Sequence, residues 1–350
     1  MHSHAGMTVS QQGRRKHGGR WRLPFPFVLR FTVRIRPSVA LSAVALSAVL
    51  LAGCATATPE AEVSPTGPPV VDLCDAAAPS GAASDAVTVE GAVGEESTAT
   101  FESPLEISGL QATVIEEGSG DAVESGELVA FALTAFSADT GEKLGSVGYG
   151  DDPTLPAQIS PDNPIGQILG CASPGARVVA TFPPSDPNAG EVYVFDFLDI
   201  IPDAAWGEPQ EPVDGMPSVT LEEDGAPTIE LPGGDAPTAV ELETLKKGDG
   251  ATVAPGDTVL VQYTGVKWSD GTVFDSSWES GAPASFQTTG VVDGFRQALE
   301  GQTVGSQVVV VIPPAFGYGE EGSSEHELAG ETLVFVVDIL GTQHAAAAPQ

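Results

Sequence analysis

The chain has 350 residues, of which 41% are hydrophobic, and a formal net charge of −34 at pH 7. This length favours two or three domains of ordinary size, each with its own core, over one compact domain. Because a strongly acidic surface repels nucleic acid and anionic lipid, we expect no nucleic-acid partner.

The first predicted segment, residues 1–53, is typical of a secretory signal. Eight of the 14 Lys and Arg residues lie between Arg14 and Arg36, and an apolar stretch, ALSAVALSAVLLAGC, runs from Ala40 to Cys54. The stretch is too short for a comfortable membrane span and ends in small residues. Its last four residues, Leu-Ala-Gly-Cys, match the bacterial lipobox, whose cysteine is diacylated after cleavage. We therefore expect a lipoprotein anchored through Cys54 on the extracytoplasmic face of the cell membrane.

Removal of this signal leaves six basic residues against 48 acidic ones, a formal charge of −42. Two cysteines remain, Cys74 and Cys171, and outside the cytoplasm an isolated pair is more often a disulfide than a metal site. The remaining histidines, His326 and His344, are too few for a zinc site, so we expect neither a metal nor another cofactor.

Two stretches of low complexity separate the remaining segments. Residues 54–86 are rich in Pro, Ala, Thr, Ser and Gly, which predicts a flexible tether between the membrane and the first domain. A second stretch, DAAWGEPQEPVDG, predicts a linker at residues 203–215. The last residues, 343–350, are predicted to form a short tail.

Between these stretches the sequence repeats itself at a constant offset of 130. EGSGDAVESGELVAFALTAFSADTGEKL, from Glu117, aligns without a gap with KGDGATVAPGDTVLVQYTGVKWSDGTVF, from Lys247. The same offset aligns GARVVATFPP with GSQVVVVIPP. One register over two separated segments indicates an internal duplication. We therefore predict two copies of one domain, a first copy at residues 87–202 and a second copy at residues 216–342.

Each copy has the pattern of short strands separated by Gly and Pro turns, with one short helix. In the second copy, β-branched apolar runs predict strands at residues 257–266, 307–312 and 331–340. The helix candidate is DGFRQALEGQ, in which Asp293 is expected to cap the first turn and the apolar side chains share one face. Many antiparallel strands and one helix indicate an α+β fold whose sheet wraps around the helix.

Five motifs of the second copy resemble the FKBP-type peptidyl-prolyl cis-trans isomerases in order and spacing. They are VQYTG from Val261, DGTVFDSS from Asp270, VVDGFRQAL from Val291, IPPAFGYG from Ile312 and TLVFVVDI from Thr332. The resemblance covers about residues 235–342. It implies an antiparallel half-barrel of five or six strands around a helix, with a hydrophobic pocket for a proline ring. It also implies that macrolide inhibitors of the family are possible ligands.

The resemblance assigns the pocket position by position. The catalytic positions are Tyr263, Asp275 and Tyr318, and the substrate-binding positions are Phe274, Val291, Val292, Phe295 and Phe335. Tyr318 is expected to donate a hydrogen bond to the substrate carbonyl, and Asp275 to orient Tyr263 or to contact the region of the carbonyl carbon. Amide resonance sets a barrier of about 18–20 kcal/mol to rotation about an X-Pro bond. An apolar pocket weakens that resonance, so no nucleophile or metal is required.

Three features depart from the family pattern. Phe295 stands where the best-known members carry tryptophan, and Ser280 stands where an arginine often partners the aspartate. The flap, EEGSSEHELAGE, is acidic and lacks the familiar Ile-Pro segment, with Leu328 as the only obvious replacement. We expect these changes to shift substrate preference away from acidic peptides.

The first copy lacks the pocket groups when the offset of 130 is applied. The positions of Tyr263, Phe274, Asp275, Val292, Phe295 and Tyr318 are occupied by Leu133, Leu144, Gly145, Asp162, Ile165 and Asn188. Matching the last strands at Phe195 and Phe335 raises the offset to 140, which predicts about ten residues missing after the Pro-Pro pair. We therefore predict a degenerate FKBP-like domain without any polar or aromatic pocket group, serving as a spacer, a chaperone surface or a partner-binding module.

Three functions are compatible with these observations. The first is a peptidyl-prolyl isomerase that assists the folding of proline-containing exported polypeptides at the cell envelope. The second is a non-catalytic, proline-binding chaperone lipoprotein, which differs only in whether bound proline turns over. The third, a ligand-binding lipoprotein of a transport system, is disfavoured because two small sheet domains lack long alternating α/β halves. The retained aromatic pocket favours the enzyme.

Overall fold

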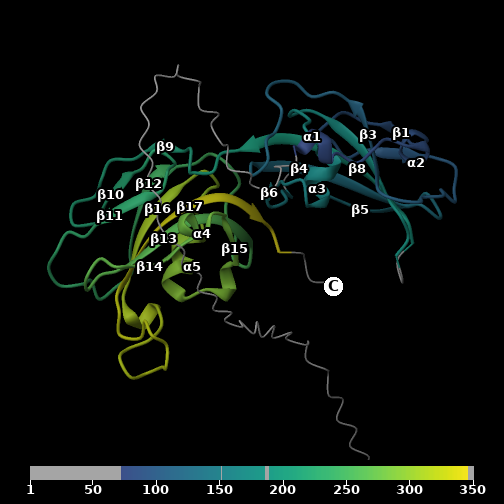
Figure 1. The fold of residues 1–350 in the computed structure, drawn as a ribbon. Coiled ribbons are helices and arrows are strands. Elements are labelled where there is room, and N and C mark those ends of the chain that lie inside the picture. Colours follow the sequence, from purple (N-terminus) through teal and green to yellow (C-terminus); the bar gives the residue numbers. More distant parts are fainter. Residues whose placement is uncertain (1–71, 151, 186–188, 346–350) are drawn as a thin grey trace, which may run out of the picture. The chain divides into compact units, whose positions relative to one another are not determined.

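The computed structural model describes residues 72–150, 152–185 and 189–345 (Figure 1). The predicted signal, the lipidation site Cys54 and most of the tether lie outside these residues, as does the end of the tail. Among the described residues, no helix is long and apolar enough to cross a membrane.

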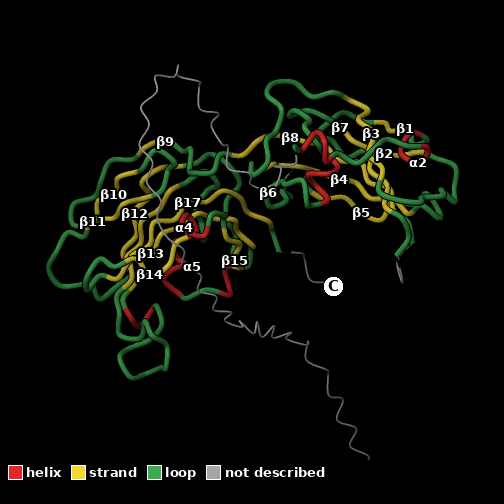
Figure 2. Tube along the Cα trace, in the orientation of Figure 1, coloured by secondary structure: helices red, strands yellow, loops and turns green. Residues whose placement is uncertain are grey.

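Two antiparallel sheets hold most of the secondary structure, and helices are few and short (Figure 2). The sheet of the first copy has the order β3-β7-β8-β4-β5, with β6 paired to β4. Its strands are β3 (Gln111–Glu116), β4 (Leu128–Ser137), β5 (Lys143–Val147), β6 (Ala157–Gln158), β7 (Arg177–Phe182) and β8 (Glu191–Ile201).

The sheet of the second copy repeats this order and adds one strand. It runs β14-β13-β17-β16-β12-β9, with β15 paired to β13. Its strands are β9 (Glu208–Pro209), β12 (Glu241–Lys247), β13 (Thr258–Lys267), β14 (Val273–Ser276), β15 (Ala284–Gln287), β16 (Gln307–Ile312) and β17 (Leu333–Gln343). The sheet order β12-β16-β17-β13-β14 in the second copy corresponds, strand by strand, to the order β3-β7-β8-β4-β5 in the first. The two copies therefore share one strand topology, and the α+β class predicted from the sequence is confirmed.

The helices are short in both copies. They are α1 (Leu73–Ala76), α2 (Ala82–Asp85), α3 (Pro164–Leu169), α4 (Ser277–Ser280) and α5 (Asp293–Leu299), with 3₁₀ turns η1 (Thr288–Gly290) and η2 (Pro314–Phe316). The prediction that Asp293 caps α5 is wrong. Val292 is the N-cap, and the Asp293 carboxylate accepts a hydrogen bond from Arg296 at 2.9 Å. As the first helical residue, Asp293 is placed to reach the side chain three positions later rather than the free backbone donors.

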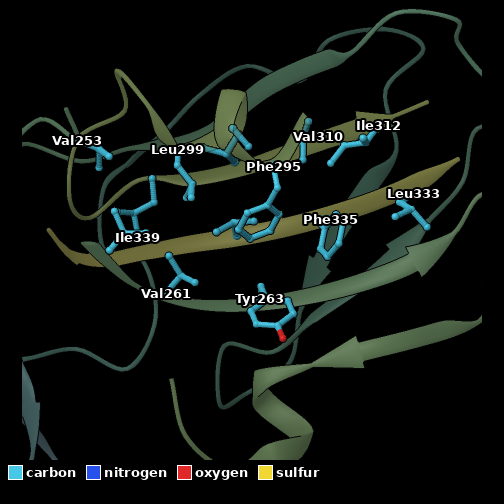
Figure 3. Packing of buried hydrophobic residues seen from close by; sticks show 14 of the residues in the cluster. Val253, Val261, Tyr263, Phe295, Leu299, Val310, Ile312, Leu333, Phe335 and Ile339 are labelled. Carbon is cyan, nitrogen blue, oxygen red and sulfur yellow. The ribbon is translucent and has the colours of Figure 1, made fainter. Parts of the chain in front are cut away.

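The core of the second copy lies between α5 and the sheet (Figure 3). Phe295, Ala298 and Leu299 form the buried face of α5, as the sequence predicts, and none of them is more than 5% exposed. They pack with β16 and β17. Fully burying an apolar side chain of this size contributes about 1.5–3 kcal/mol, so this layer is a main source of stability for the pocket that it supports.

The opposite face of each sheet is covered by a hairpin that the sequence analysis missed. The hairpins are β1 (Thr88–Glu90) with β2 (Thr98–Thr100), and β10 (Ser218–Leu221) with β11 (Pro227–Glu230). Val219 and Ile229 pack against the valines of β16 that point away from α5, and Val89 and Ala99 occupy the same place in the first copy. This double coverage explains why residues 308–312 of β16 are all apolar.

The hairpins extend the duplication. Val89 pairs with Ala99, and Val219 pairs with Ile229. Both pairs are related by the offset of 130 found in the sheets. The repeated unit therefore includes the hairpin as well as the sheet and its helix.

The predicted linker, residues 203–215, is folded onto the second sheet in its first half. β9 pairs with β12. The Ala205 N–H donates to the Asp338 carboxylate at 2.8 Å, and the Lys246 ammonium donates to the Ala205 carbonyl at 2.8 Å. Residues 205–209 are therefore not a free linker. Their Pro and Gly content suits a linker, but composition cannot show that their backbone groups have partners on a distant strand.

The end of the predicted tether is also folded. Leu73 of α1 and Ala83 of α2 are buried against the first sheet and α3. A disulfide joins Cys74, in α1, to Cys171, just after α3. This is the pairing that the sequence predicts, and it ties the entry segment of the first copy to its helix.

The sequence match of the last strands at Phe195 and Phe335 is wrong by two residues. In β7 and β8 Arg177 pairs with Asp196, whereas in β16 and β17 Gln307 pairs with Asp338. The two aspartates differ by 142, so about twelve residues rather than ten are missing from the preceding loop. A shift of two residues leaves the same face of a strand apolar, so hydrophobic pattern alone cannot detect it.

Candidate active site

A pocket of about 260 Å³ opens on the second copy. Its lining consists of Tyr263, Phe274, Asp275, Phe286, Gly290, Val291, Val292, Phe295, Tyr318 and Phe335. These come from β13, β14, β15, α5, β17 and the segments that follow β15 and β16. All eight residues assigned from the family resemblance line this one pocket.

The floor and walls of the pocket are aromatic rings packed edge to face or tilted, and three of them, Tyr263, Phe295 and Phe335, are labelled in Figure 3. The ring centroids of Phe295 and Phe335 are 5.0 Å apart, and those of Phe274 and Phe335 are 5.4 Å apart. Tyr263 lies 6.2 Å from both Phe295 and Phe335. Such pairs are favoured because the positive edge of one ring meets the negative face of the other. Each ring therefore helps to fix the next.

A glycine of β13 makes room for two of these rings. A Cβ atom at Gly265 would lie 2.7 Å from the Phe274 ring and 2.8 Å from the Phe335 ring. The first copy has Ala135 at the equivalent position, where the neighbouring side chain on β5 is Leu144 instead of a phenylalanine. The close approach of two rings to β13 is thus a property of the second copy, and it depends on Gly265.

Asp275 lies at the rim and orients one of the tyrosines. The Tyr263 hydroxyl donates to the Asp275 carboxylate at 2.7 Å. Burial and this hydrogen bond both raise the pKa of Tyr263 above its ordinary value, so the phenol stays protonated. The Ser280 hydroxyl donates to the Ser276 carbonyl at 3.0 Å.

Tyr318 reaches the pocket from the loop after β16. It follows η2, and the next residue, Gly319, has a φ of +94°, which favours glycine. Burial, and then the negative charge of Asp275, raise the pKa of Tyr318, so this phenol also stays protonated. Within the described residues its hydroxyl has no hydrogen-bond partner. Tyr318 therefore presents an uncommitted donor to the pocket.

Phe286 and Gly290 line the pocket but were missed by the sequence analysis. Phe286, in β15, is 5.7 Å from the Tyr263 ring and 5.8 Å from the Phe295 ring between centroids. Its backbone pairs with Val259 of β13. The alternation in Ala-Ser-Phe-Gln was a strand signal, but four residues are too few to separate a strand from a turn.

The strand registers locate the equivalent positions in the first copy. Leu133 stands where the second copy has Tyr263, and Gly145 stands where it has Asp275. Phe335, however, corresponds to Tyr193, whose hydroxyl donates to Glu191 at 2.5 Å. The prediction that every aromatic pocket group is lost is therefore wrong at this position. Asn188, matched to Tyr318 by sequence, lies outside the described residues.

Comparisons with known proteins agree with this geometry. The family model of FKBP-type peptidyl-prolyl cis-trans isomerases matches residues 250–340. A probable FK506-binding protein of Corynebacterium glutamicum is 41% identical over 114 residues, which are 33% of this chain and 96% of that protein. The FK506-binding protein of Streptomyces anulatus is 38% identical over 117 residues, 33% of this chain and 94% of that protein.

A third relative is longer than the shared domain. The outer membrane protein MIP of Legionella longbeachae is 36% identical over 110 residues, 31% of this chain and 47% of that protein. Together these matches show that the chain belongs to the FKBP-type peptidyl-prolyl cis-trans isomerases. It is a peptidyl-prolyl isomerase, and the resemblance inferred from five motifs is confirmed.

Proposed function

We propose that the pocket of the second copy catalyses rotation about X-Pro bonds in exported polypeptides, with Tyr318 as hydrogen-bond donor to the substrate carbonyl. One observation carries the assignment: an enclosure of aromatic rings has an uncommitted phenol and a carboxylate at its rim. The walls suit a proline ring, and the rim suits the peptide group that precedes it.

The mechanism follows from what these groups do to an amide. Planarity depends on a charge-separated resonance form, which is poorly solvated among aromatic walls, so the twisted amide loses less there than in water. The Tyr263 hydroxyl is hydrogen-bonded to Asp275, so its ring serves as part of the pocket wall. Tyr318 holds the carbonyl oxygen while the C–N bond turns. Because the apolar walls disfavour the charge-separated planar form, they favour the twisted state over either planar isomer and lower the barrier in both directions, while the Tyr318 hydrogen bond fixes the position of the carbonyl.

We propose that macrolides of the FK506 type compete with substrate for the same pocket. Two relatives are named FK506-binding proteins, and the six aromatic rings that line the pocket here offer a largely apolar, preformed surface of the kind that small ligands favour.

The test is a prolyl isomerisation assay on the chain without its signal. Turnover of cis-proline tetrapeptides that FK506 inhibits is the expected result. A chain that binds the peptide without accelerating its isomerisation would instead be a proline-binding chaperone, and the catalytic roles would have to be abandoned.

We propose that the protein acts at the cell envelope as a lipoprotein anchored through Cys54. The support is the order of basic segment, apolar stretch and Leu-Ala-Gly-Cys in the sequence, together with a relative named as an outer membrane protein. Diacylation gives stable anchoring where a single acyl chain does not. In cell fractionation, Cys54→Ala should move the protein out of the membrane fraction; unchanged association would exclude this anchor.

We propose that the first copy is a degenerate FKBP-like domain that serves as a spacer or as a binding module for partner proteins. The shared strand order and the duplicated hairpin support common descent. The replacement of Tyr263 and Asp275 by Leu133 and Gly145 argues against catalysis there.

A further inference from the structure

The flap between β16 and β17, yellow in Figure 1, carries a histidine that the mechanism above does not use. The His326 imidazole stacks face to face on the Tyr318 ring, with the centroids 3.7 Å apart and the planes inclined by 2°. Tyr318 is half-buried, and His326 lies on the outside of the flap. The imidazole therefore covers one face of the ring that presents the uncommitted hydroxyl.

Both rings are held by the same short segment. The Ser324 hydroxyl donates to the Tyr318 carbonyl at 2.9 Å, and the His326 N–H reaches the Ser324 hydroxyl at 3.4 Å. The Leu328 N–H donates to His326 Nδ1 at 3.2 Å. Because Nδ1 accepts this bond, the ring hydrogen lies on Nε2.

Leu328 connects this segment to the core. Its side chain is 5% exposed and belongs to the same buried cluster as Phe295 and Phe335. The amide that fixes the imidazole is therefore itself fixed by packing. The chain of contacts runs from the core through Leu328 and His326 to the Tyr318 ring.

We infer that His326 is a positioning residue for the isomerase reaction, and that it holds the Tyr318 phenol in the orientation needed to meet the substrate carbonyl. The inference rests on the proposed role of Tyr318. The glycines on both sides of Tyr318 offer no side chain to pack against its ring, and its hydroxyl has no partner within the described residues to restrain the ring. A donor contributes most when it is already oriented before its acceptor arrives. The stacked imidazole supplies that restraint.

Two substitutions separate stacking from hydrogen bonding. His326→Phe keeps a flat ring over Tyr318 and removes the acceptor for the Leu328 N–H. His326→Gln keeps an acceptor and removes the ring. If stacking positions Tyr318, His326→Gln and His326→Ala should lower kcat/KM roughly three- to tenfold, mainly through kcat, while His326→Phe stays within about twofold of the unmodified protein.

The same assay, with an uncharged proline tetrapeptide and the mature chain, includes a double-mutant cycle. In a Tyr318→Ala background, His326→Ala should have no further effect, because the residue acts through Tyr318. Glu325→Gln, an exposed neighbour in the same loop, is the matched control. Thermal unfolding of each variant reports whether the fold is kept, and the Phe and Gln variants decide the question if the alanine variant does not fold.

The outcomes distinguish this inference from the function on which it rests. An unmodified protein without turnover would overturn the proposed isomerase site itself. Turnover in the unmodified protein with equal turnover in His326→Gln would overturn the positioning role alone. Equal losses in His326→Phe and His326→Gln, or additive losses in the Tyr318→Ala background, would also overturn it.

Discussion

Two tyrosines reach the pocket, and Asp275 separates their roles. The Tyr263 hydroxyl is engaged with the Asp275 carboxylate at 2.7 Å. Burial and the nearby negative charge of Asp275 both raise the pKa of Tyr318. Within the described residues, however, the Tyr318 hydroxyl has no hydrogen-bond partner. The first phenol is therefore a wall whose orientation is set, and the second is the donor available to substrate.

Tyr318→Phe should lower kcat/KM by about tenfold, because it removes the hydrogen bond that holds the substrate carbonyl during rotation. Tyr263→Phe is the matched control, since it deletes the same atom from a ring of the same pocket, and it should cost less than about threefold. Both are measured with the tetrapeptide assay and checked by thermal unfolding. An equal loss in the two variants would contradict the division of roles.

The pH profile should report the Tyr318 phenol. Its neutral form is the donor, and ionisation abolishes that donor as pH rises through the pKa. Because burial and Asp275 raise this pKa, activity should stay constant from pH 7 past the ordinary tyrosine value of about 10. In Asp275→Asn the charge is gone, so the alkaline loss should move to lower pH. An alkaline limb at the same pH in both proteins would show that another group controls it.

At the scale of elements, the flap between β16 and β17 carries a cluster of acidic side chains. Four of its glutamates, Glu320, Glu321, Glu325 and Glu327, are exposed. Within the described residues none of these carboxylates has a cationic partner. Like charges this close to a binding site repel acidic ligands and attract basic ones, and salt screens both effects.

Peptides with lysine next to proline should therefore be turned over faster than peptides with glutamate there, by on the order of fivefold at low salt. Replacing the four glutamates with glutamine should reduce this ratio toward one. Salt at 0.5 M should do the same, because it shortens the Debye length to roughly a few ångströms and so screens the glutamate charges. The measurement is kcat/KM for matched peptides. A ratio that neither change affects would place the preference inside the pocket rather than on the flap.

The disulfide belongs to the first copy, and its loss should affect stability without affecting catalysis. The bond closes a loop of 97 residues between α1 and the end of α3. The chain-entropy account assigns about 4–5 kcal/mol to a loop of this length, and strain or residual structure reduces the measured value. Cys74→Ser with Cys171→Ser should lower the free energy of unfolding of the first copy by about 2–5 kcal/mol, followed in urea. A loss of isomerase activity in native buffer would contradict the assignment of catalysis to the second copy alone.

Strong periodic elements were predictable from the sequence, and short or non-local ones were not. The apolar run at residues 308–312 lies in β16 (Gln307–Ile312), because five consecutive β-branched residues next to a turn strongly favour a strand. The hairpin of β10 and β11 was not predicted, because its strands are short and half polar. The register of β17 was predicted wrongly, because a two-residue slip conserves the apolar face.

The candidate site was predictable for a different reason. Its eight assigned residues lie in the five motifs shared with the family, so the resemblance alone predicts their positions. Phe286 and His326 lie outside those motifs. Phe286 contacts Tyr263 on another strand, and His326 contacts Tyr318 from a loop without a periodic pattern. These contacts are visible only in the folded chain.

At the scale of the whole molecule, a buried aspartate plays an equivalent part in each copy. Asp196 binds the Arg177 guanidinium at 2.6 Å and accepts the Gly94 N–H from the hairpin at 2.8 Å. Asp338 accepts from Gln307 at 2.7 Å and from the Ala205 N–H at 2.8 Å. Each carboxylate therefore ties a segment that precedes its sheet to the last strand, and its partner on the neighbouring strand is an arginine in the first copy and a glutamine in the second.

This anchor defines where the catalytic copy can be cut from the chain. A fragment of residues 203–350 keeps Ala205 and β9, whereas a fragment of residues 216–350 loses both. Burial raises the pKa of Asp338, and the Ala205 N–H is one of the contacts that opposes this rise. Loss of a donor to a buried carboxyl costs about 1–3 kcal/mol.

We expect the fragment of residues 203–350 to isomerise proline tetrapeptides within about twofold of the whole mature chain, because the family match and every pocket residue lie inside it. The fragment of residues 216–350 should be less stable in urea by about 1–3 kcal/mol. A fragment of residues 54–202 should fold with its disulfide and show no turnover, since it has Leu133 and Gly145 where Tyr263 and Asp275 stand. Turnover in that fragment, or inactivity of a folded 203–350 fragment, would mean that catalysis does not belong to the second copy alone.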